Sequence, residues 1–226
     1  MNDLFMLVAA YLYLFATLGA TEWLRRQQGY SVDFTRKVVH IVAGMTVFFL
    51  PVFQNRWIAL IPPVSFIFIN ALSYWKGTFQ AMETGEQWRL GTIYFPIAFS
   101  ALTWWLWETK PLLVASLMPM TWGDALAAVI GRRWGRRKFR VPGGHRTPEG
   151  SLTFLFVAWV VTALPLAFLA GTPFPGRQAI PAALAVAAVA AAVEAVSPWG
   201  IDNLTVPAIS ALALRAAVSL SPSLLP

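Results

Sequence analysis

Cysteine is absent from the chain of 226 residues, histidine occurs only twice, and charged residues make up only 12% of the total. The absence of cysteine excludes disulfide bonds, thiolate nucleophiles and cysteine-ligated metals. The charged fraction is about half that of an ordinary soluble domain, whereas 58% of the residues are hydrophobic. This balance argues against intrinsic disorder and against a soluble globular protein, and it favours a protein embedded in a membrane.

Long apolar stretches fill most of the sequence. A helix that crosses a membrane uses about 20 residues, so eight such helices would occupy about 160 residues and leave no room for a separate soluble domain. We therefore predict an all-α fold in which residues 1–226 form a single integral-membrane domain, a bundle of seven or eight transmembrane helices with short loops. The predicted spans are Leu4–Trp23, Val38–Phe53, Trp57–Trp75, Thr92–Trp107, Pro111–Ile130, Ser151–Ala170, Ala179–Val196 and Val206–Leu220.

Lysine and arginine gather in alternate loops. Four basic residues follow the first span, two follow the third and seven follow the fifth, whereas the loops on the opposite side hold three. Because short cytoplasmic loops retain basic residues, this asymmetry predicts that the N-terminus lies outside and that the odd-numbered spans end in the cytoplasm. The first span is expected to be an uncleaved anchor, since its basic residues follow the apolar run. The net charge of +7 therefore indicates membrane orientation and attraction to anionic lipid, and no nucleic-acid partner is expected.

The most polar loop follows the fifth predicted span. Asp124 lies about two turns before that span ends, and residues 131–150 then contain seven basic residues and five glycines. Arginine side chains bind phosphate oxygens in pairs, glycines let backbone N–H groups approach a phosphate, and the helix that begins at Ser151 favours an anion at its start. The loop therefore predicts a polyphosphate site. The alternative is a basic loop that contacts only lipid headgroups.

Three further polar clusters are expected at the same membrane surface. Arg36, Lys37 and His40 open the second span, and Arg36 and His40 share one helix face. The loop before the fourth span contains Glu83, Glu86 and Arg89, which alone indicate a solvated loop. Glu194 lies in a helix of alanine and valine, and Asp202 and Asn203 follow in a short turn.

Acidic residues at these positions are informative because a carboxylate is costly inside a membrane, at roughly 2.5–3.5 kcal/mol near its centre. Asp124, Glu194 and Asp202 are expected to converge beside the arginines of the basic loop. Oxygen ligands next to phosphate-binding arginines fit a site for Mg²⁺ and a nucleotide, since Mg²⁺ bridges phosphate oxygens. The glycine-rich phosphate loops of soluble nucleotide enzymes and the protein-kinase motifs are absent from the sequence.

Short motifs in a fixed order resemble a family of membrane enzymes. The motifs are Arg36-Lys37-x-x-His40, Gly123-Asp124-Ala125-x-Ala127, Gly131-Arg132-x-x-Gly135-Arg136, Glu149-Gly150-Ser151 and Asp202-Asn203-Leu204-Thr205-Val206-Pro207. They resemble the integral-membrane lipid-alcohol kinases, which include dolichol kinase, phytol and farnesol kinases and CTP-dependent diacylglycerol kinase, and they are distantly similar to the phosphatidate cytidylyltransferases. One departure is that the family often has Lys-Ser shortly before the Glu-Gly-Ser triplet, where this chain has Arg146-Thr147.

The resemblance implies a kinase that transfers the γ-phosphoryl group of CTP, or of another nucleoside triphosphate, to the hydroxyl of an isoprenoid alcohol or of diacylglycerol in the membrane. Asp124, Glu194 and Asp202 would hold Mg²⁺ or another divalent cation, and Glu194 or His40 would accept the proton of the alcohol. The residues expected to bind the nucleotide are Arg36, Lys37, Gly131, Arg132, Gly135, Arg136, Arg137, Lys138, Arg146, Thr147, Glu149, Gly150, Ser151 and Asn203. The active site would face the cytoplasm.

Two alternatives remain open at this point. A cytidylyltransferase that makes a CDP-lipid needs the same kinds of residue, although this chain is short for that class. A transporter or scaffold without enzymatic activity is the second alternative. A transporter would be expected to carry charges near the membrane midplane in repeated halves, whereas this sequence gathers them at one surface and has no evident repeat. The sequence leaves the identity of the lipid, the nucleotide base and the oligomeric state open.

Overall fold

Each of the eight predicted apolar stretches coincides with a helical segment of the computed structural model, which describes residues 2–78, 90–142, 144–174 and 176–220. The helices are α1 (Asp3–Gln28), α2 (Val32–Gly44), α3 (Arg56–Lys76), α4 (Gly91–Trp105), α5 (Lys110–Met118), α6 (Ala125–Trp134), α7 (Pro148–Phe168), α8 (Ala179–Val196) and α9 (Asp202–Ser219). Four short segments extend or join them: η1 (Met45–Val52), η3 (Trp107–Thr109), η4 (Pro119–Asp124, a π-helix) and η5 (Gly176–Gln178). The predicted all-α class is confirmed. The predicted loop residues Glu83, Glu86 and Arg89 lie outside the described residues.

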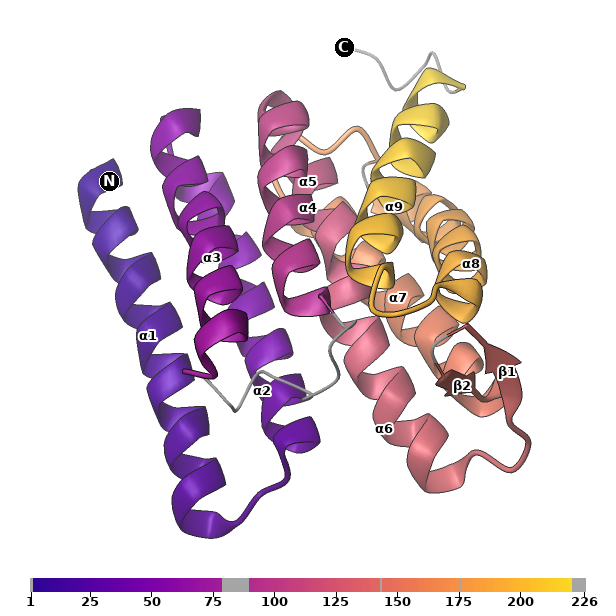
Figure 1. Cartoon of the computed structure of the whole chain (residues 1–226). Coiled ribbons are helices and arrows are strands. Elements are labelled where there is room, and N and C mark those ends of the chain that lie inside the picture. Colours follow the sequence, from indigo (N-terminus) through magenta and orange to yellow (C-terminus); the bar gives the residue numbers. More distant parts are fainter. Residues whose placement is uncertain (1, 79–89, 143, 175, 221–226) are drawn as a thin grey trace.

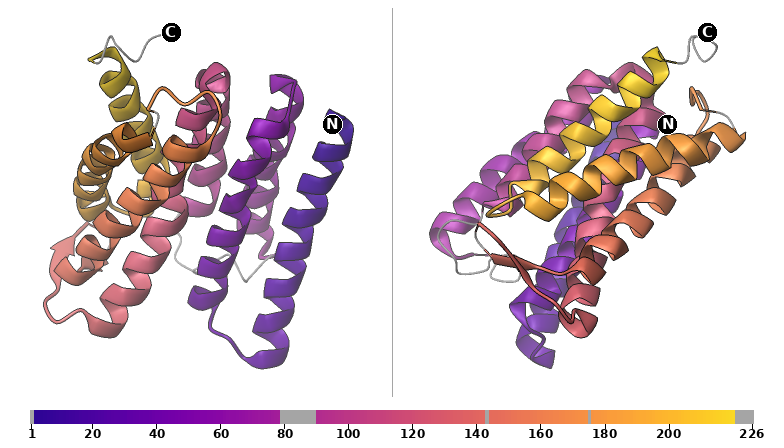
Figure 2. Two further views of the ribbon diagram at one scale, coloured as in Figure 1. Left: turned by 180° about the vertical axis from the view of Figure 1, so that it is seen from behind. Right: turned by 90° about the vertical axis from the view of Figure 1, so that its right-hand side faces the viewer.

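The helices form two groups that α4 connects (Figure 1). In the first group, α1 packs on α2 and α3 at one side of the molecule. In the second group, α5, η4 and α6 form one continuous central helix that packs on α7, and α8 packs on α7 and α9 at the opposite side (Figure 2). α4 contacts both α3 and α9, so it lies between the two groups.

Burial and exposure follow opposite patterns in the centre and at the periphery of the bundle. Residues 112–117 of the central helix have no exposed surface. The outer faces carry large apolar side chains in the open, and Phe68, Trp75 and Phe168 are 70%, 79% and 81% exposed. Extended apolar exposure of this kind is unfavourable in water and is expected where helices face lipid.

Local sequence signals define several helix ends. The Ser31 hydroxyl caps α2 by accepting a hydrogen bond from the Phe34 N–H, and the Asn55 side chain caps α3. The helices α1 and α3 end at Gly29 and Gly77, whose φ angles of 68° and 64° lie in the left-handed region that favours glycine. Both ends of α3 lie within one residue of the predicted span, whereas α1 continues five residues beyond the predicted Trp23 and α2 begins six residues before the predicted Val38.

Six helical segments are long and apolar enough to cross a membrane by their length and composition. They are Asp3–Gln28, Phe34–Val52, Arg56–Lys76, Trp107–Trp134, Pro148–Phe168 and Gly176–Val196. Among the other predicted spans, α4 has 15 residues, and α9 has 18 residues that include Asp202 and Arg215. Six of the predicted spans are therefore matched by helices of sufficient length, whereas the seventh and eighth crossings and the orientation in the membrane stay predictions.

The basic loop after α6 contains a short β-hairpin that the sequence analysis did not predict. Strands β1 (Phe139–Val141) and β2 (Gly144–Arg146) pair in antiparallel register, with Phe139 opposite Arg146 and Arg140 opposite His145. The sequence offered little signal, because each strand has only three residues and four of the six are polar or glycine. The hairpin extends from the end of α6 to the start of α7 (Figure 1).

Candidate active site

Three carboxylates from three different elements meet inside the bundle. Asp124 ends η4, Glu194 lies two residues before the end of α8, and Asp202 begins α9. One oxygen of each carboxylate lies within 4.8 Å of the other two, and Glu194 and Asp202 are only 2% and 4% exposed. The structure therefore brings together the three acidic residues that the sequence analysis selected as metal ligands. We refer to them as the carboxylate cluster.

Asp124 owes its position to a widened helical turn in the middle of the central helix. A π-helical segment shifts the side chains that follow it around the helix axis, and such segments are frequent at functional sites. The indole N–H of Trp122 donates to the sulfur of Met45 at 3.2 Å, which ties the segment to the α2–η1 helix. A Cβ atom on Gly123 would lie 2.9 Å from the ring of Phe154, so the glycine allows η4 to approach α7 closely. Both contacts fix the turn that directs Asp124 toward the cluster.

Asp202 is held by the tight turn that precedes α9. Its Oδ1 atom accepts hydrogen bonds from the backbone N–H and the side-chain amide of Asn203, at 3.0 and 3.1 Å. The same amide donates to the carbonyl of Gly200 at 3.1 Å. Gly200 has a φ angle of 82°, and a Cβ atom there would lie 3.2 Å from the backbone of Gly91. The turn therefore requires glycine for its conformation and for its close contact with α4.

Arg146 is the basic residue at the centre of the carboxylate cluster. It ends β2, and its guanidinium group contacts Glu194 Oε1 and Asp202 Oδ2 at 2.7 Å each and Asp124 Oδ1 at 4.0 Å. Burial alone would lower the pKa of Arg146, but the charges of Glu194, Asp202 and Asp124 outweigh burial and raise that pKa above its ordinary value. The hairpin thus holds a permanent positive charge among three carboxylates.

The carboxylate cluster has the donor set that a hard divalent cation prefers. All its ligand atoms are carboxylate oxygens, the ligands that Mg²⁺ takes in proteins. Within the described part of the chain, the Oε2 atom of Glu194 is buried and has no hydrogen-bond partner. A buried acceptor without a partner is unfavourable, so this atom is suited to bind a cation. Asp124, Glu194 and Asp202 therefore fit a Mg²⁺ ion.

The predicted phosphate loop uses several of its polar groups to stabilise its own fold. The hydroxyl of Thr147 accepts a hydrogen bond from the Gly150 N–H at 3.1 Å and caps α7. Glu149 accepts a hydrogen bond from the Arg136 N–H at 3.1 Å, which fastens the loop after α6 to the start of α7. A Cβ atom on Gly131 would lie 3.4 Å from the Cα atom of Gly150. These two glycines allow α6 and α7 to cross closely, a role that the sequence analysis did not assign to them.

The basic side chains of the predicted phosphate loop fall into two groups. Arg146 points into the carboxylate cluster, whereas the others expected to bind phosphate are exposed at the end of α6 and at the beginning of the hairpin. The second group consists of Arg132, Arg136, Arg137 and Lys138. The remaining backbone positions, Gly135 and Ser151, are partly buried where the loop meets α7.

The basic residues of α2 approach the site from the other side. Arg36, Lys37 and His40 line a cavity whose wall also contains Asp124 and Asn203. The His40 Nε2 atom lies 2.9 Å from the carbonyl oxygen of Met120. A carbonyl can only accept, so Nε2 carries a proton and Nδ1 of the neutral ring is left as an acceptor. The second predicted base therefore borders the same cavity as Asp124.

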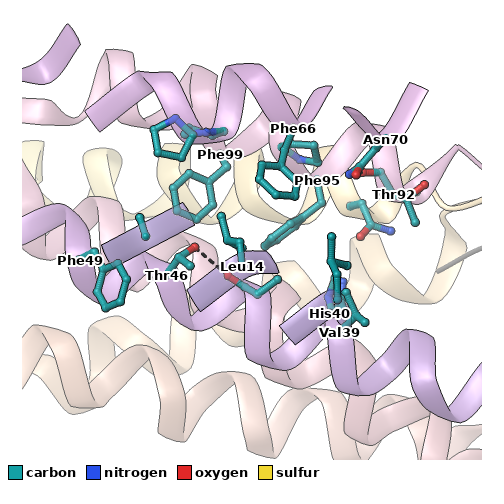
Figure 3. Close-up of a pocket in the computed structure, with 18 of the residues that line it drawn as sticks. Leu14, Val39, His40, Thr46, Phe49, Phe66, Asn70, Thr92, Phe95 and Phe99 are labelled. Carbon is teal, nitrogen blue, oxygen red and sulfur yellow. Dashed lines mark hydrogen bonds between the residues drawn. The ribbon is translucent and has the colours of Figure 1, made fainter. Parts of the chain in front are cut away.

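This cavity continues from the polar residues into an apolar channel, which we call the tail channel. Figure 3 shows His40, Asn70 and Thr92 at one end, Leu14, Phe66, Phe95 and Phe99 between, and Phe49 with Thr46 at the other end. The walls come from α1, α2, η1, α3 and α4. The apolar lining consists of Ala10, Leu14, Leu18, Val39, Ala43, Phe49, Leu50, Phe53, Ala59, Pro62, Pro63, Phe66, Phe95, Pro96 and Phe99.

The sequence analysis missed the tail channel and two of the polar residues at its polar end, Asn70 and Thr92. Asn70 is buried on α3, and its side-chain amide donates to the carbonyl of Thr92 on α4 at 2.7 Å. A signal existed, because Asn70 is an uncharged polar residue within the predicted apolar span Trp57–Trp75 and such residues face the interior of a membrane bundle. The aromatic residues gave no signal of their own, since one sequence does not show which helix faces meet.

The chain is similar to curated proteins over most of its length. It is 34% identical to a phytol kinase of Synechocystis sp. over 205 residues, which cover 88% of this chain and 86% of the relative. It is 28% identical to a probable chloroplastic phytol kinase of Triticum aestivum over 217 residues, which cover 85% and 70% of the two chains. A chloroplastic farnesol kinase of Arabidopsis thaliana is 25% identical over 138 residues, 55% of this chain and 45% of the relative. No protein-family model and no solved structure matches the chain.

Proposed function

Because the chain belongs to the phytol kinase family of integral-membrane isoprenoid-alcohol kinases, we propose that it transfers the γ-phosphoryl group of a nucleoside triphosphate to the terminal hydroxyl of an isoprenoid alcohol. The preferred acceptor would be an alcohol of the phytol or farnesol type, and CTP would be the donor. The products would be the alcohol monophosphate and the nucleoside diphosphate. The choice of CTP rests on the motif resemblance to CTP-dependent lipid kinases.

The tail channel is the observation that carries this proposal. Its polar end includes Asp124 of the carboxylate cluster, and its apolar walls extend from there between α1, α2 and α3. Along α3, the lining residues from Asn70 to Ala59 span about 16 Å at 1.5 Å per residue. An alcohol with a long hydrocarbon tail would bury that tail against apolar side chains and present its hydroxyl beside the cluster. A small polar acceptor would leave the channel without a ligand.

The residues around the hydroxyl have separate roles in the proposed transfer. Asp124, Glu194 and Asp202 would hold Mg²⁺, which when bound neutralises charge on the transferring phosphates. Arg146 and Lys37 provide further positive charge at the same place. The alcohol oxygen forms a bond to the γ-phosphorus as the bond to the leaving nucleotide breaks, and the hydroxyl proton passes to a base. We assign that base to His40, because it lines the channel and its Nδ1 atom is an acceptor.

We also propose that the carboxylate cluster opens toward the cytoplasm. The basic residues of the α6–α7 loop support this orientation, since cytoplasmic loops retain arginine and lysine. The exposed side chains at the end of α6 and on the hairpin would attract the nucleotide and anionic lipid headgroups to this face. The N-terminus would then lie on the opposite side of the membrane, as the loop charges predict.

Labelled CTP tests the proposed reaction directly. Membranes that contain the protein should transfer label from γ-labelled CTP to phytol or farnesol and leave α-labelled CTP as CDP in the aqueous phase. Appearance of the α label in a lipid would instead identify a cytidylyltransferase. Transfer of neither label, with phytol, farnesol, a polyprenol or diacylglycerol and with ATP, UTP or GTP as donors, would overturn the kinase proposal and leave the transporter or scaffold alternative.

Filling the far end of the tail channel should select against long acceptors. Ala59 is 1% exposed and lines that end, so Ala59→Phe is expected to reduce kcat/KM for phytol by about 10-fold or more while farnesol, with its shorter chain, is less affected. The expected size follows from overpacking costs of roughly 1–3 kcal/mol. Steady-state kinetics with both alcohols measures the ratio of kcat/KM for phytol to kcat/KM for farnesol. Val64→Phe on the exposed face of α3 is the control, and an equal loss with both alcohols would contradict a channel that measures tail length.

A further inference from the structure

The nitrogen and the oxygen of the Asn70 side-chain amide differ in their hydrogen bonding. Its Nδ2 atom donates to the carbonyl oxygen of Thr92 at 2.7 Å. In a helix this carbonyl would accept from the residue four positions later, which is Pro96 and has no N–H group. Asn70 therefore supplies the hydrogen bond that the proline in α4 withholds. Because a carbonyl can only accept, this bond also fixes which end of the amide is nitrogen and which is oxygen.

The oxygen of the same amide has a buried position and no partner among the described residues. Asn70 is 8% exposed, and its Oδ1 atom is buried without a hydrogen bond. Asn70 also lines the tail channel, with Phe66 and Phe95 toward the apolar part and His40 at the same polar end (Figure 3). An amide oxygen accepts hydrogen bonds and does not donate them. A ligand that forms a hydrogen bond with the Asn70 Oδ1 atom must therefore place an O–H or N–H donor at the polar end of the tail channel.

We propose that Asn70 is a substrate-binding residue whose Oδ1 atom accepts a hydrogen bond from the hydroxyl of the acceptor alcohol. This inference rests on the proposed kinase function. It identifies the Asn70 Oδ1 atom as the group by which the protein distinguishes an alcohol from other molecules with the same tail. A hydrocarbon, an aldehyde or an ester of equal length would fill the apolar walls but would leave Oδ1 without a donor. Rejection of ligands that leave a buried polar group unpaired is a strong source of specificity.

The arrangement also sets the direction of the hydroxyl. Asn70 is anchored to α4 through Thr92, and α4 contacts α9, which carries Asp202 and Asn203. The acceptor oxygen therefore lies on α3, which this bond joins to α4, and α4 packs directly against α9, an element of the carboxylate cluster. A hydroxyl that donates its hydrogen to Asn70 on binding keeps its oxygen lone pairs available toward the cluster, where phosphoryl transfer needs them. As the oxygen forms its bond to phosphorus, the proton would leave Asn70 for the Nδ1 atom of His40, which lines the same channel. Orientation of this kind supports transfer without requiring a strong base.

Binding of an alcohol and of its matching hydrocarbon separates this role from a structural one. In detergent and without nucleotide, the wild-type protein should bind phytol more tightly than phytene, the hydrocarbon with the same tail. In Asn70→Leu, which keeps side-chain size but removes both polar atoms, the alcohol should lose about 10-fold in affinity and the hydrocarbon should lose little, so the ratio approaches one. Ser65→Ala is the control on α3, because Ser65 bonds to Tyr11 and Pro62.

Each outcome of this binding comparison decides whether Asn70 binds the hydroxyl of the alcohol. A collapse of the alcohol-to-hydrocarbon ratio in Asn70→Leu, with the ratio unchanged in Ser65→Ala, supports it. Equal weakening of both ligands would show that Asn70 only joins α3 to α4, and an unchanged ratio would show that another group recognises the hydroxyl; either overturns the proposal. Failure of the wild-type protein to transfer phosphate, with the binding ratio intact, would instead refute the kinase function and leave the alcohol site standing.

Discussion

Asp124→Asn and Asp202→Asn should each abolish phosphorylation of the lipid alcohol while the protein still accumulates in the membrane. Asparagine keeps the shape of the side chain but removes the charge that a divalent cation needs. Loss of an outer-shell partner of a metal costs roughly 10–100-fold in affinity or activity, so loss of a direct ligand should exceed that range. Transfer of label from γ-labelled CTP to phytol, with Mg²⁺ varied from substoichiometric to saturating, measures the effect.

Glu22→Gln provides the matched control for these two variants. Glu22 is also a carboxylate on a predicted transmembrane helix, but it pairs with Arg25 and Arg26 near the end of α1. Its replacement should leave the rate of transfer close to that of the wild-type protein. A second readout is thermal stabilisation in detergent by Mg²⁺, which the two cluster variants should lose and Glu22→Gln should keep. Near-normal turnover in both cluster variants would refute the assignment of the metal site.

The helices and the acidic residues of the site follow from the sequence for a clear physical reason. Membrane spans need long apolar stretches, so α1, α3 and α7 are evident without knowledge of their partners. A carboxylate in such a helix is expensive unless it has a function or a partner. Glu194 is therefore informative in a helix that otherwise contains only alanine, valine, leucine, isoleucine and proline, and the structure places it within the carboxylate cluster.

The partner of the carboxylates could not be predicted because it depends on a strand register. The basic loop offers seven lysine and arginine residues, and nothing in their spacing distinguishes Arg146 from the rest. In the structure, Arg146 ends β2 opposite Phe139 and faces the cluster, whereas the neighbouring His145 is exposed. Side chains alternate between the two faces of a strand, so a shift of one residue would have directed a different side chain inward.

The end of the central helix and the role of the loop glycines also could not be predicted from the sequence. The span was expected to end at Ile130, but helical structure continues to Trp134 because Arg132 and Arg133 are good helix formers. Asp124 therefore lies ten residues before the helix end, about 15 Å along the axis, whereas two turns before the end of the span were expected. The glycines of the loop were assigned to phosphate binding, whereas Gly131 and Gly150 also serve the crossing of α6 and α7. Tertiary contacts of this kind involve residues that are far apart in the chain.

Arg146→Met is expected to have two effects that respond differently to divalent cations. Removal of one partner from a buried ion pair typically costs about 3–5 kcal/mol, and the lower end applies because 22% of the Arg146 side chain is exposed. Without divalent cation, the variant should unfold in detergent at a clearly lower temperature, since Glu194 and Asp202 lose their ion-pair partner. Added Mg²⁺ should restore part of that stability, because it neutralises the same oxygens. Phosphoryl transfer should stay low, because the positive charge beside the phosphates is still missing.

The comparison of Mg²⁺ binding with and without Arg146 tests this account. In the wild-type protein Mg²⁺ must compete with the guanidinium group for Glu194 and Asp202, so Mg²⁺ without nucleotide should stabilise Arg146→Met more strongly than the wild-type protein. Arg146→Lys should lie between them, because a single ammonium cannot contact two carboxylates as the planar guanidinium does. Arg140→Met on β1 is the control, since Arg140 is exposed on the same hairpin. Equal stabilisation of all four proteins by Mg²⁺ would mean that Arg146 and the cation occupy different places.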